Sequence, residues 1–263
     1  MLPLNKSIKT LLAAILISGA AISIHADEKM FGYSYQADSI LPKGRVETAQ
    51  WATLRSGKNQ GQYARWDIRH EVEYGITDTF TGALYLNFTN EFSDGVTSVD
   101  NGNRMKFDGV SVELKQMMLS PYKNPIGVLL YLEPTYSGNE FELEGKVVLE
   151  SIIDEKWHIV TNLVAEQEWE YSASGTTHSS VFKITGGAAY PLDPTLSVGI
   201  EGKSTTKYNG FYSSAQSTTL FLGPNIHFGT DKFQITATLL KQITNVMDSA
   251  ESVEARVITG IYF

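Results

Sequence analysis

The chain has 263 residues, no cysteine and a formal net charge of −8. The lack of cysteine excludes a disulfide framework and a thiolate metal site. The acidic balance argues against a nucleic-acid partner, because proteins that bind nucleic acid carry clustered lysine and arginine.

Residues 1–26 have the pattern of a cleaved signal peptide. Lys6 and Lys9 precede an apolar stretch at 11–24 that is too short to span a bilayer, and Ala26 is a small residue at a suitable cleavage position. We expect cleavage after Ala26. The 21 basic residues then fall to 19 against 29 acidic ones, so the net charge becomes about −10. The chain is therefore predicted to be exported.

Residues 27–44 follow the signal peptide and do not alternate cleanly between polar and apolar residues. Pro42 lies within this segment. Two interpretations remain open: a short extra strand, or a plug that folds inward. The remainder, 45–263, contains no proline- or serine-rich linker and is predicted to form one domain.

From residue 45 onward, polar and apolar residues alternate with period two, which is typical of strands with two different faces. In 63–76, for example, Arg65 and Glu73 share one face and Trp66 and Val72 share the other. Twelve segments follow this pattern: 45–56, 63–76, 80–92, 107–118, 126–136, 140–153, 157–171, 179–192, 196–207, 217–228, 233–246 and 252–263. Their lengths suit tilted membrane-spanning strands. The sequence therefore predicts an all-β fold, a transmembrane antiparallel up-and-down β-barrel of about 12 strands.

The connections predict how the barrel is oriented. Short turns such as 77–79 and 193–195 alternate with mostly longer polar links such as 93–106 and 208–216. Short periplasmic turns and longer extracellular loops are typical of outer-membrane barrels, so we expect both termini to face the periplasm. Aromatic residues on the apolar faces gather towards both strand ends, like the girdles found at membrane interfaces.

The final segment, 252–263, alternates and ends on an aromatic residue, Phe263. This ending resembles the assembly signal of bacterial outer-membrane barrels and implies the barrel-assembly machinery as a partner. Alternation alone does not separate a membrane barrel from a soluble barrel with an apolar core. The signal peptide, the girdles, the loop asymmetry and Phe263 together favour a barrel surrounded by outer-membrane lipid.

Several phrases in the first third of the chain resemble an uncharacterised family of Gram-negative outer-membrane proteins. They are 31–35 (FGYSY), 41–44 (LPKG), 50–51 (QW), 55–58 (RSGK) with Gly61, and 73–78 (EYGITD). The last phrase is similar to a strand and turn found in many transporter-like barrels, including those associated with phenol degradation. The resemblance implies a porin-like barrel in the outer membrane, and it carries no catalytic or ligand residue.

Most charges on the predicted strands lie on the inward face. If 140–153 and 157–171 form a hairpin about Glu155, antiparallel pairing brings six glutamates together in opposing pairs. This predicted acidic wall of the pore consists of Glu140, Glu142, Glu144, Glu166, Glu168 and Glu170. Like charges that face each other need water, a cation or a basic group, so we expect the wall to line a hydrated lumen.

A predicted basic wall lies across the lumen, because the first strand of a twelve-stranded ring faces the seventh. It consists of Arg55, Arg65, Arg69 and Arg256, with Lys203 and Lys207 between the two walls. The two walls together predict a transverse field that would orient dipolar or zwitterionic solutes. In the alternative interpretation these charges pair with each other, or with 27–44, and seal the barrel.

These features favour a passive channel or transporter for small solutes. The alternative is a sealed structural or receptor barrel that acts through loops 93–106 and 208–216. A barrel hydrolase is less favoured, because the sequence has no Gly-x-Ser-x-Gly or His-Glu-x-x-His motif and no evident serine–histidine pair. We expect no catalytic residue, no cofactor and no metal; a divalent ion held by oxygen ligands in the acidic wall is a weaker alternative.

Overall fold

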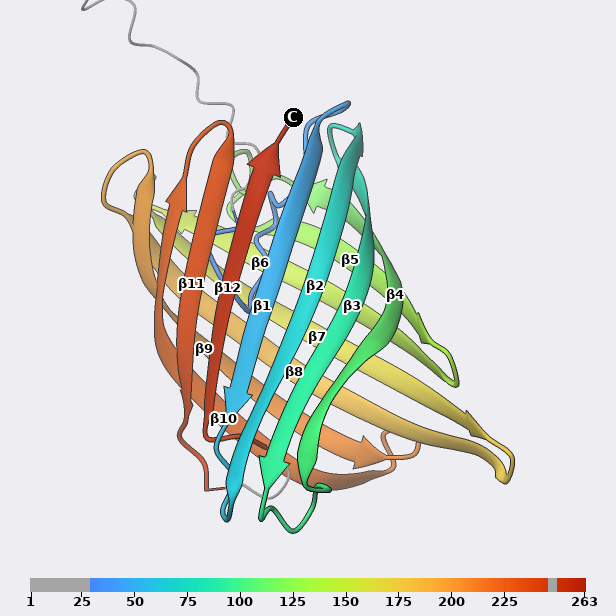
Figure 1. Cartoon of the computed structure of the whole chain (residues 1–263). Helices are drawn as coiled ribbons and strands as arrows, with labels where there is room; N and C mark the ends of the chain where they lie inside the picture. Colours follow the sequence, from blue (N-terminus) through green and yellow to red (C-terminus); the bar gives the residue numbers. More distant parts are fainter. Residues whose placement is uncertain (1–28, 246–249) are drawn as a thin grey trace, which may run out of the picture.

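The computed structural model describes residues 29–245 and 250–263, and the predicted signal peptide lies outside these ranges. Within them, twelve antiparallel strands pair with their neighbours in the sequence, and β1 also pairs with β12, which closes the barrel (Figure 1). No helix in the described part of the chain is long and apolar enough to cross a bilayer. The predicted all-β up-and-down barrel is confirmed. Its strands are β1 (Val46–Ser56), β2 (Gln62–Thr77), β3 (Phe80–Asp94), β4 (Gly102–Leu119), β5 (Gly127–Ser137), β6 (Glu140–Ile153), β7 (Trp157–Ser172), β8 (Gly175–Pro191), β9 (Leu196–Asn209), β10 (Ser214–Gly229), β11 (Phe233–Gln242) and β12 (Val253–Tyr262).

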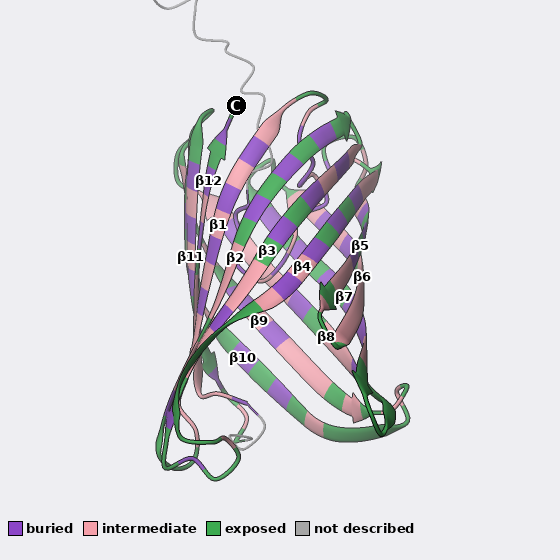
Figure 2. Cartoon of the chain, turned by 45° about the vertical axis from the view of Figure 1, so that its right-hand side comes forward, coloured by how far each residue is buried: buried purple, intermediate pink, exposed green. Residues whose placement is uncertain are grey.

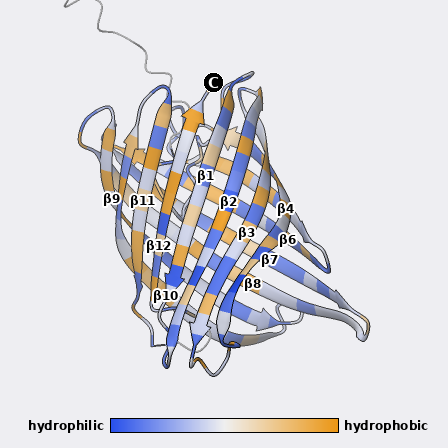
Figure 3. Cartoon of the chain, viewed as in Figure 1, coloured by the Kyte–Doolittle hydropathy of each residue, from blue (hydrophilic) through white to orange (hydrophobic). Residues whose placement is uncertain are grey.

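The barrel is apolar outside and polar inside. Buried and exposed residues alternate along the strands (Figure 2), and hydrophobic and hydrophilic residues alternate along them as well (Figure 3). Many large apolar side chains are exposed. Val72 and Leu239 are more than half exposed, whereas Glu47 and Glu73 are 0% exposed. A soluble barrel would show the opposite arrangement, because its apolar side chains would form the core. The exterior is therefore suited to hydrocarbon.

At the end of the barrel away from the carboxy-terminus, some hairpins extend further than the alternation of polar and apolar residues predicts. β4 begins at Gly102 rather than near residue 107, and β8 begins at Gly175 rather than near residue 179. Gly102 still pairs with Ser93, because backbone pairing continues through polar residues that have no apolar face. The predicted loop 93–106 is therefore reduced to 95–101.

A β-bulge in β4 reverses the alternation. The register between β3 and β4 shifts between Leu86 and Phe88, and Gly109 on β4 has a φ of +102°. Beyond the bulge Phe107 is exposed on the outside, while Asp108 turns into the lumen. Strict alternation from the buried Ser111 would place Phe107 inside, so the sequence pattern does not reveal this change of face.

Residues 29–44 form no strand, and we call them the lumen segment. Residues 29–41 lie inside the barrel, at the end where the carboxy-terminus lies (Figure 1), and Lys43 and Gly44 are exposed where the segment leaves it. Gly75 of β2 marks where the segment passes the wall: the Gly44 N–H donates to the Gly75 carbonyl (2.8 Å), and the Gly75 N–H donates to the Arg45 carbonyl (3.0 Å). A Cβ at residue 75 would lie 2.1 Å from the Pro42 carbonyl oxygen. Glycine is therefore required at this position by the close approach of the two backbones.

The carboxy-terminal residue completes the seam between β12 and β1. The Phe263 N–H donates to the Val46 carbonyl (2.9 Å), and the Val46 N–H donates back to the Phe263 carbonyl (3.4 Å). Phe263 is 68% exposed. This position leaves the residue accessible, and its role as an assembly signal stays a prediction.

Candidate functional site

The lumen segment is held to the wall through its backbone. Because it pairs with no strand, its N–H groups need other acceptors, and inward side chains of the wall supply them. Glu201 of β9 accepts bonds from Gly32 (2.8 Å), Tyr33 (2.9 Å) and Ser34 (3.0 Å). Further wall acceptors are Gln234 for Lys29 (2.9 Å), Asn162 for Tyr35 (2.6 Å), Glu150 for Ala37 (2.8 Å) and Thr81 for Leu41 (3.1 Å). The void left beside Trp51 measures about 10 Å³, room for about one water molecule.

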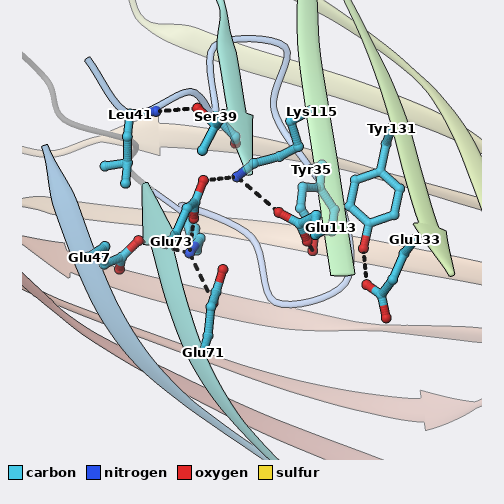
Figure 4. A network of polar contacts seen from close by, with 12 residues as sticks. Tyr35, Ser39, Leu41, Glu47, Glu71, Glu73, Glu113, Lys115, Tyr131 and Glu133 are labelled. Atoms are coloured by element: carbon cyan, nitrogen blue, oxygen red, sulfur yellow. Dashed lines mark hydrogen bonds and ion pairs between the residues drawn. The ribbon is translucent and has the colours of Figure 1, made fainter. Parts of the chain in front are cut away.

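Six charged side chains form a buried group that we call the lysine–glutamate cluster: Lys29, Lys115, Glu47, Glu71, Glu73 and Glu113. Figure 4 labels all of them except Lys29. Lys29 comes from the lumen segment, and the others come from β1, β2 and β4. Lys29 Nζ lies 2.9 Å from Glu47, 3.3 Å from Glu71 and 3.2 Å from Glu73. Lys115 Nζ lies 2.6 Å from Glu73 and 3.3 Å from Glu113. Two ammonium groups are thus shared among four carboxylates.

Aromatic side chains complete the cluster. The Trp51 indole N–H donates to Glu71 (2.6 Å), and the Tyr35 hydroxyl donates to Glu113 (3.1 Å). Burial raises the pKa of Tyr35 well above its usual value, and the charge of Glu113 raises it further, so the hydroxyl stays a donor. The Tyr85 hydroxyl lies 2.8 Å from Glu71 and 2.7 Å from Glu113 and can donate to either.

The cluster was not identified from the sequence, although one signal for it was present. The pairing of β1 with β2 puts Glu47 directly opposite Glu73 on the inner face, and two opposed carboxylates need a cation. Oxygens of Glu71, Glu73 and Glu113 lie within 4.8 Å of one another, close enough to share a metal ion. The ammonium groups of Lys29 and Lys115 contact these carboxylates, so the chain supplies its own cations at this point.

A second polar space, the mouth cavity, lies in the half of the lumen away from the termini. Its volume is about 380 Å³. The charged residues in its lining are Arg65, Arg69, Asp67, Asp108, Glu133, Glu140, Glu142 and Glu168. Six carboxylates against two guanidinium groups make this cavity acidic.

The six glutamates of the predicted acidic wall meet in the pairs that the hairpin implies: Glu140 with Glu170, Glu142 with Glu168, and Glu144 with Glu166. Glu144 is contacted by Lys146 (2.5 Å) and Lys183 (3.8 Å), and Glu166 by Lys183. Within the described residues, no lysine or arginine nitrogen lies within 4.0 Å of the other four carboxylates. Glu140, Glu142 and Glu168 line the mouth cavity, whereas Glu170 is exposed outside it. Their role in a pore stays a prediction.

The residues of the predicted basic wall are interleaved with acids. Arg55 (2.6 Å) and Arg65 (2.6 Å) both contact Asp67. Glu254 is contacted by Lys203 at 2.6 Å and by Arg55 at 3.6 Å. These acids alternate with the basic residues along the same inward faces, and they are not part of the predicted basic wall. They weaken the basic side of the predicted field, which stays a prediction.

Two further members of this wall lie apart from those ion pairs. Arg256 donates to the Gly32 carbonyl (2.9 Å) and lies over the Tyr33 ring at 4.2 Å, so it holds the lumen segment. Lys207 is exposed near the end of β9.

Arg69 stands between the mouth cavity and the lysine–glutamate cluster. It lines the cavity and pairs with Glu133 at 2.6 Å. Its guanidinium also lies 3.8 Å from the centre of the Tyr85 ring, and Tyr85 contacts Glu71 and Glu113 of the cluster. The layer that Arg69 makes on Tyr85 therefore lies between the mouth cavity and the lysine–glutamate cluster.

A closed antiparallel barrel with a lipid-compatible exterior and a charged interior defines the class of this protein: it is an outer-membrane β-barrel. The chain belongs to the family described as "Family of unknown function (DUF6662)", whose model matches residues 23–147 and 139–254. The predicted membership of an uncharacterised family of outer-membrane barrels is confirmed. No curated protein matches the chain in sequence.

Several solved structures are similar in fold. The COG4313 outer membrane channel from Pseudomonas putida F1 has a TM-score of 0.64 and 16% identity, with 85% of this chain and 97% of that chain covered. The NanC porin has a TM-score of 0.53 and 12% identity, with 81% and 98% covered. The translocator domain of the autotransporter NalP from Neisseria meningitidis has a TM-score of 0.54 and 11% identity, with 83% and 88% covered. These similar structures include channels and porins; at such identities the likeness concerns the fold alone.

Proposed function

We propose that this protein is a passive channel or transporter for small polar solutes, with a charged lumen that residues 29–44 close. The observation that carries the proposal is the way the lumen is filled. A sealed narrow barrel is filled by side chains of its own wall. Here the end of the lumen near the termini is filled by a separate segment, held through polar contacts such as Glu201 with Gly32 and Glu150 with Ala37. If the segment leaves, the wall that remains is hydrophilic and can hold water.

The orientation and the processing follow from the same proposal. Cleavage after Ala26 would leave residues 27–28 ahead of the lumen segment, and both termini would face the periplasm with the short turns. The mouth cavity would then open towards the cell exterior, and Phe263 would guide assembly from the periplasmic side. The likeness in fold to an outer membrane channel and to a porin supports transport over catalysis.

A planar-bilayer recording of the purified protein tests the proposal. We expect infrequent, discrete openings, because the lumen segment fills its end of the barrel. Traces that stay closed at all voltages, both for the full chain and for a variant without residues 29–44, would overturn the channel and favour a sealed receptor barrel.

The selectivity of these openings tests the acidic wall. We expect Glu142→Gln together with Glu168→Gln to reduce the preference for cations, because these two carboxylates face each other in the mouth cavity without an ion-pair partner. The measurement is the reversal potential in a KCl gradient.

The matched control is Asp154→Asn together with Glu155→Gln, which removes two carboxylates exposed in the β6–β7 turn. This pair should leave the reversal potential unchanged. Equal shifts for the two double variants would show that the acidic wall does not set the selectivity.

A further inference from the structure

The lysine–glutamate cluster has the composition of a binding site for an alkylammonium group. Three carboxylates, Glu47, Glu71 and Glu73, surround the Lys29 ammonium at 2.9–3.3 Å. The Trp51 ring lies 5.6 Å from the same nitrogen, within reach of a cation–π interaction. The four side chains of the ion pairs are at most 4% exposed. A buried site of this composition suits a ligand that combines a positive charge, N–H donors and a short apolar stem.

The occupant of this site belongs to a segment that is not part of the barrel wall. Lys29 lies at the start of the described chain. The chain enters the barrel wall only after Arg45, where β1 begins. In contrast, Lys115 is fixed on β4, and its ammonium contacts Glu73 and Glu113 from the wall itself. When the lumen segment leaves, the carboxylates around Lys29 lose that cation, whereas those around Lys115 keep theirs.

The approach to the site from the mouth cavity is also acidic. Glu140, Glu142 and Glu168 line that cavity without an ion-pair partner among the described residues. They would concentrate cations next to the layer that Arg69 forms on Tyr85. A cationic solute thus meets carboxylates on both sides of that layer.

We propose that this site binds small primary alkylammonium solutes, and that Lys29 is an internal competitor that occupies the site while the channel is closed. The inference rests on the proposed channel, because a solute that binds in place of Lys29 frees the lumen segment and favours opening. The tethered lysine has a high effective concentration, so a free amine displaces it only at high concentration.

The first experiment follows thermal unfolding of the full chain in detergent. Lys29→Gln empties the ammonium position, so we expect a lower midpoint than for the wild type, restored in a dose-dependent way by n-butylammonium chloride. Tetramethylammonium chloride carries the same charge but no N–H donor and should restore much less. The matched control is Lys43→Gln, an exposed lysine of the same segment; its midpoint should be unchanged and insensitive to either salt.

The outcomes separate the possible ligands. Equal restoration by n-butylammonium, tetramethylammonium and CaCl₂ would overturn recognition of a primary ammonium in favour of general cation binding. No restoration by n-butylammonium would overturn the site itself.

A second measurement uses the wild type and therefore does not depend on folding of the variant. In a planar bilayer, n-butylammonium should raise the fraction of time spent open, and tetramethylammonium should not. An open fraction that n-butylammonium leaves unchanged would contradict the competition with Lys29. If n-butylammonium restores the midpoint of Lys29→Gln but no conductance is seen, the ammonium site stands and the channel is overturned. If conductance is seen without that restoration, the channel stands and the ammonium site is overturned.

Discussion

Deletion of residues 29–44 is expected to change the barrel from mostly closed to mostly open in a planar bilayer. The segment leaves only about 10 Å³ of space beside Trp51, and its removal uncovers a wall that carries Glu150, Glu201 and the glutamates of the lysine–glutamate cluster. Water and small ions can then enter, because the uncovered side chains are polar. The measurement is single-channel conductance of the refolded variant.

A peptide of residues 29–44 provides the control for this deletion. Added from the side of the termini, it should block the open variant, whereas a peptide of the same composition in scrambled order should not. A deletion variant that is folded, as judged by heat-modifiable migration on a gel, and still shows no current would contradict the gating role of the segment.

Replacement of Lys115 by methionine is expected to lower the free energy of unfolding by about 3–5 kcal/mol, the usual cost of removing one partner from a buried ion pair. Its side chain is 0% exposed, and it is the wall's own cation between Glu73 and Glu113. Without it, two carboxylates remain buried with less positive charge nearby. Urea unfolding of the protein in lipid vesicles measures the change.

Two further variants identify the cause of that loss. Lys232→Met removes an exposed lysine in the β10–β11 turn and should change the stability by less than about 0.5 kcal/mol. Lys115→Met combined with Glu113→Gln should recover part of the loss, because one of the uncompensated charges is removed as well. A double variant as unstable as the sum of its single variants would show that the ion pair is not responsible.

The barrel itself could be predicted from the sequence because a membrane strand has a wet face and a lipid face. Arg65 and Glu73 alternate with Trp66 and Val72, and this alternation fixes which side of β2 faces the lumen. The register of β6 with β7 also followed, since a tight turn about Glu155 leaves one antiparallel pairing that keeps both apolar faces outside. The facing of β2 and the register of β6 with β7 both depend on residues close together in the sequence, so the sequence pattern is enough to predict them.

The closed lumen could not be predicted in the same way. The lumen segment has no period, because its side chains contact different strands: Lys29 contacts β1 and β2, Gly32 contacts β9, and Ala37 contacts β6. Such contacts depend on the closed ring. The change of face at Gly109 was missed because a bulge adds one residue without altering the composition of the strand.

The most direct test of the gating role is a reversible lock on the lumen segment. A Cβ at residue 32 would lie 3.0 Å from the Thr238 Cβ. An outward shift of about 0.5 Å would bring the pair into the range of about 3.5–4.5 Å that disulfides need. Because the chain has no cysteine of its own, Gly32→Cys with Thr238→Cys can form only this bridge within one molecule. The oxidised protein should show no current in a planar bilayer, and current should appear in the same membrane after dithiothreitol is added. Equal currents before and after reduction would contradict the account.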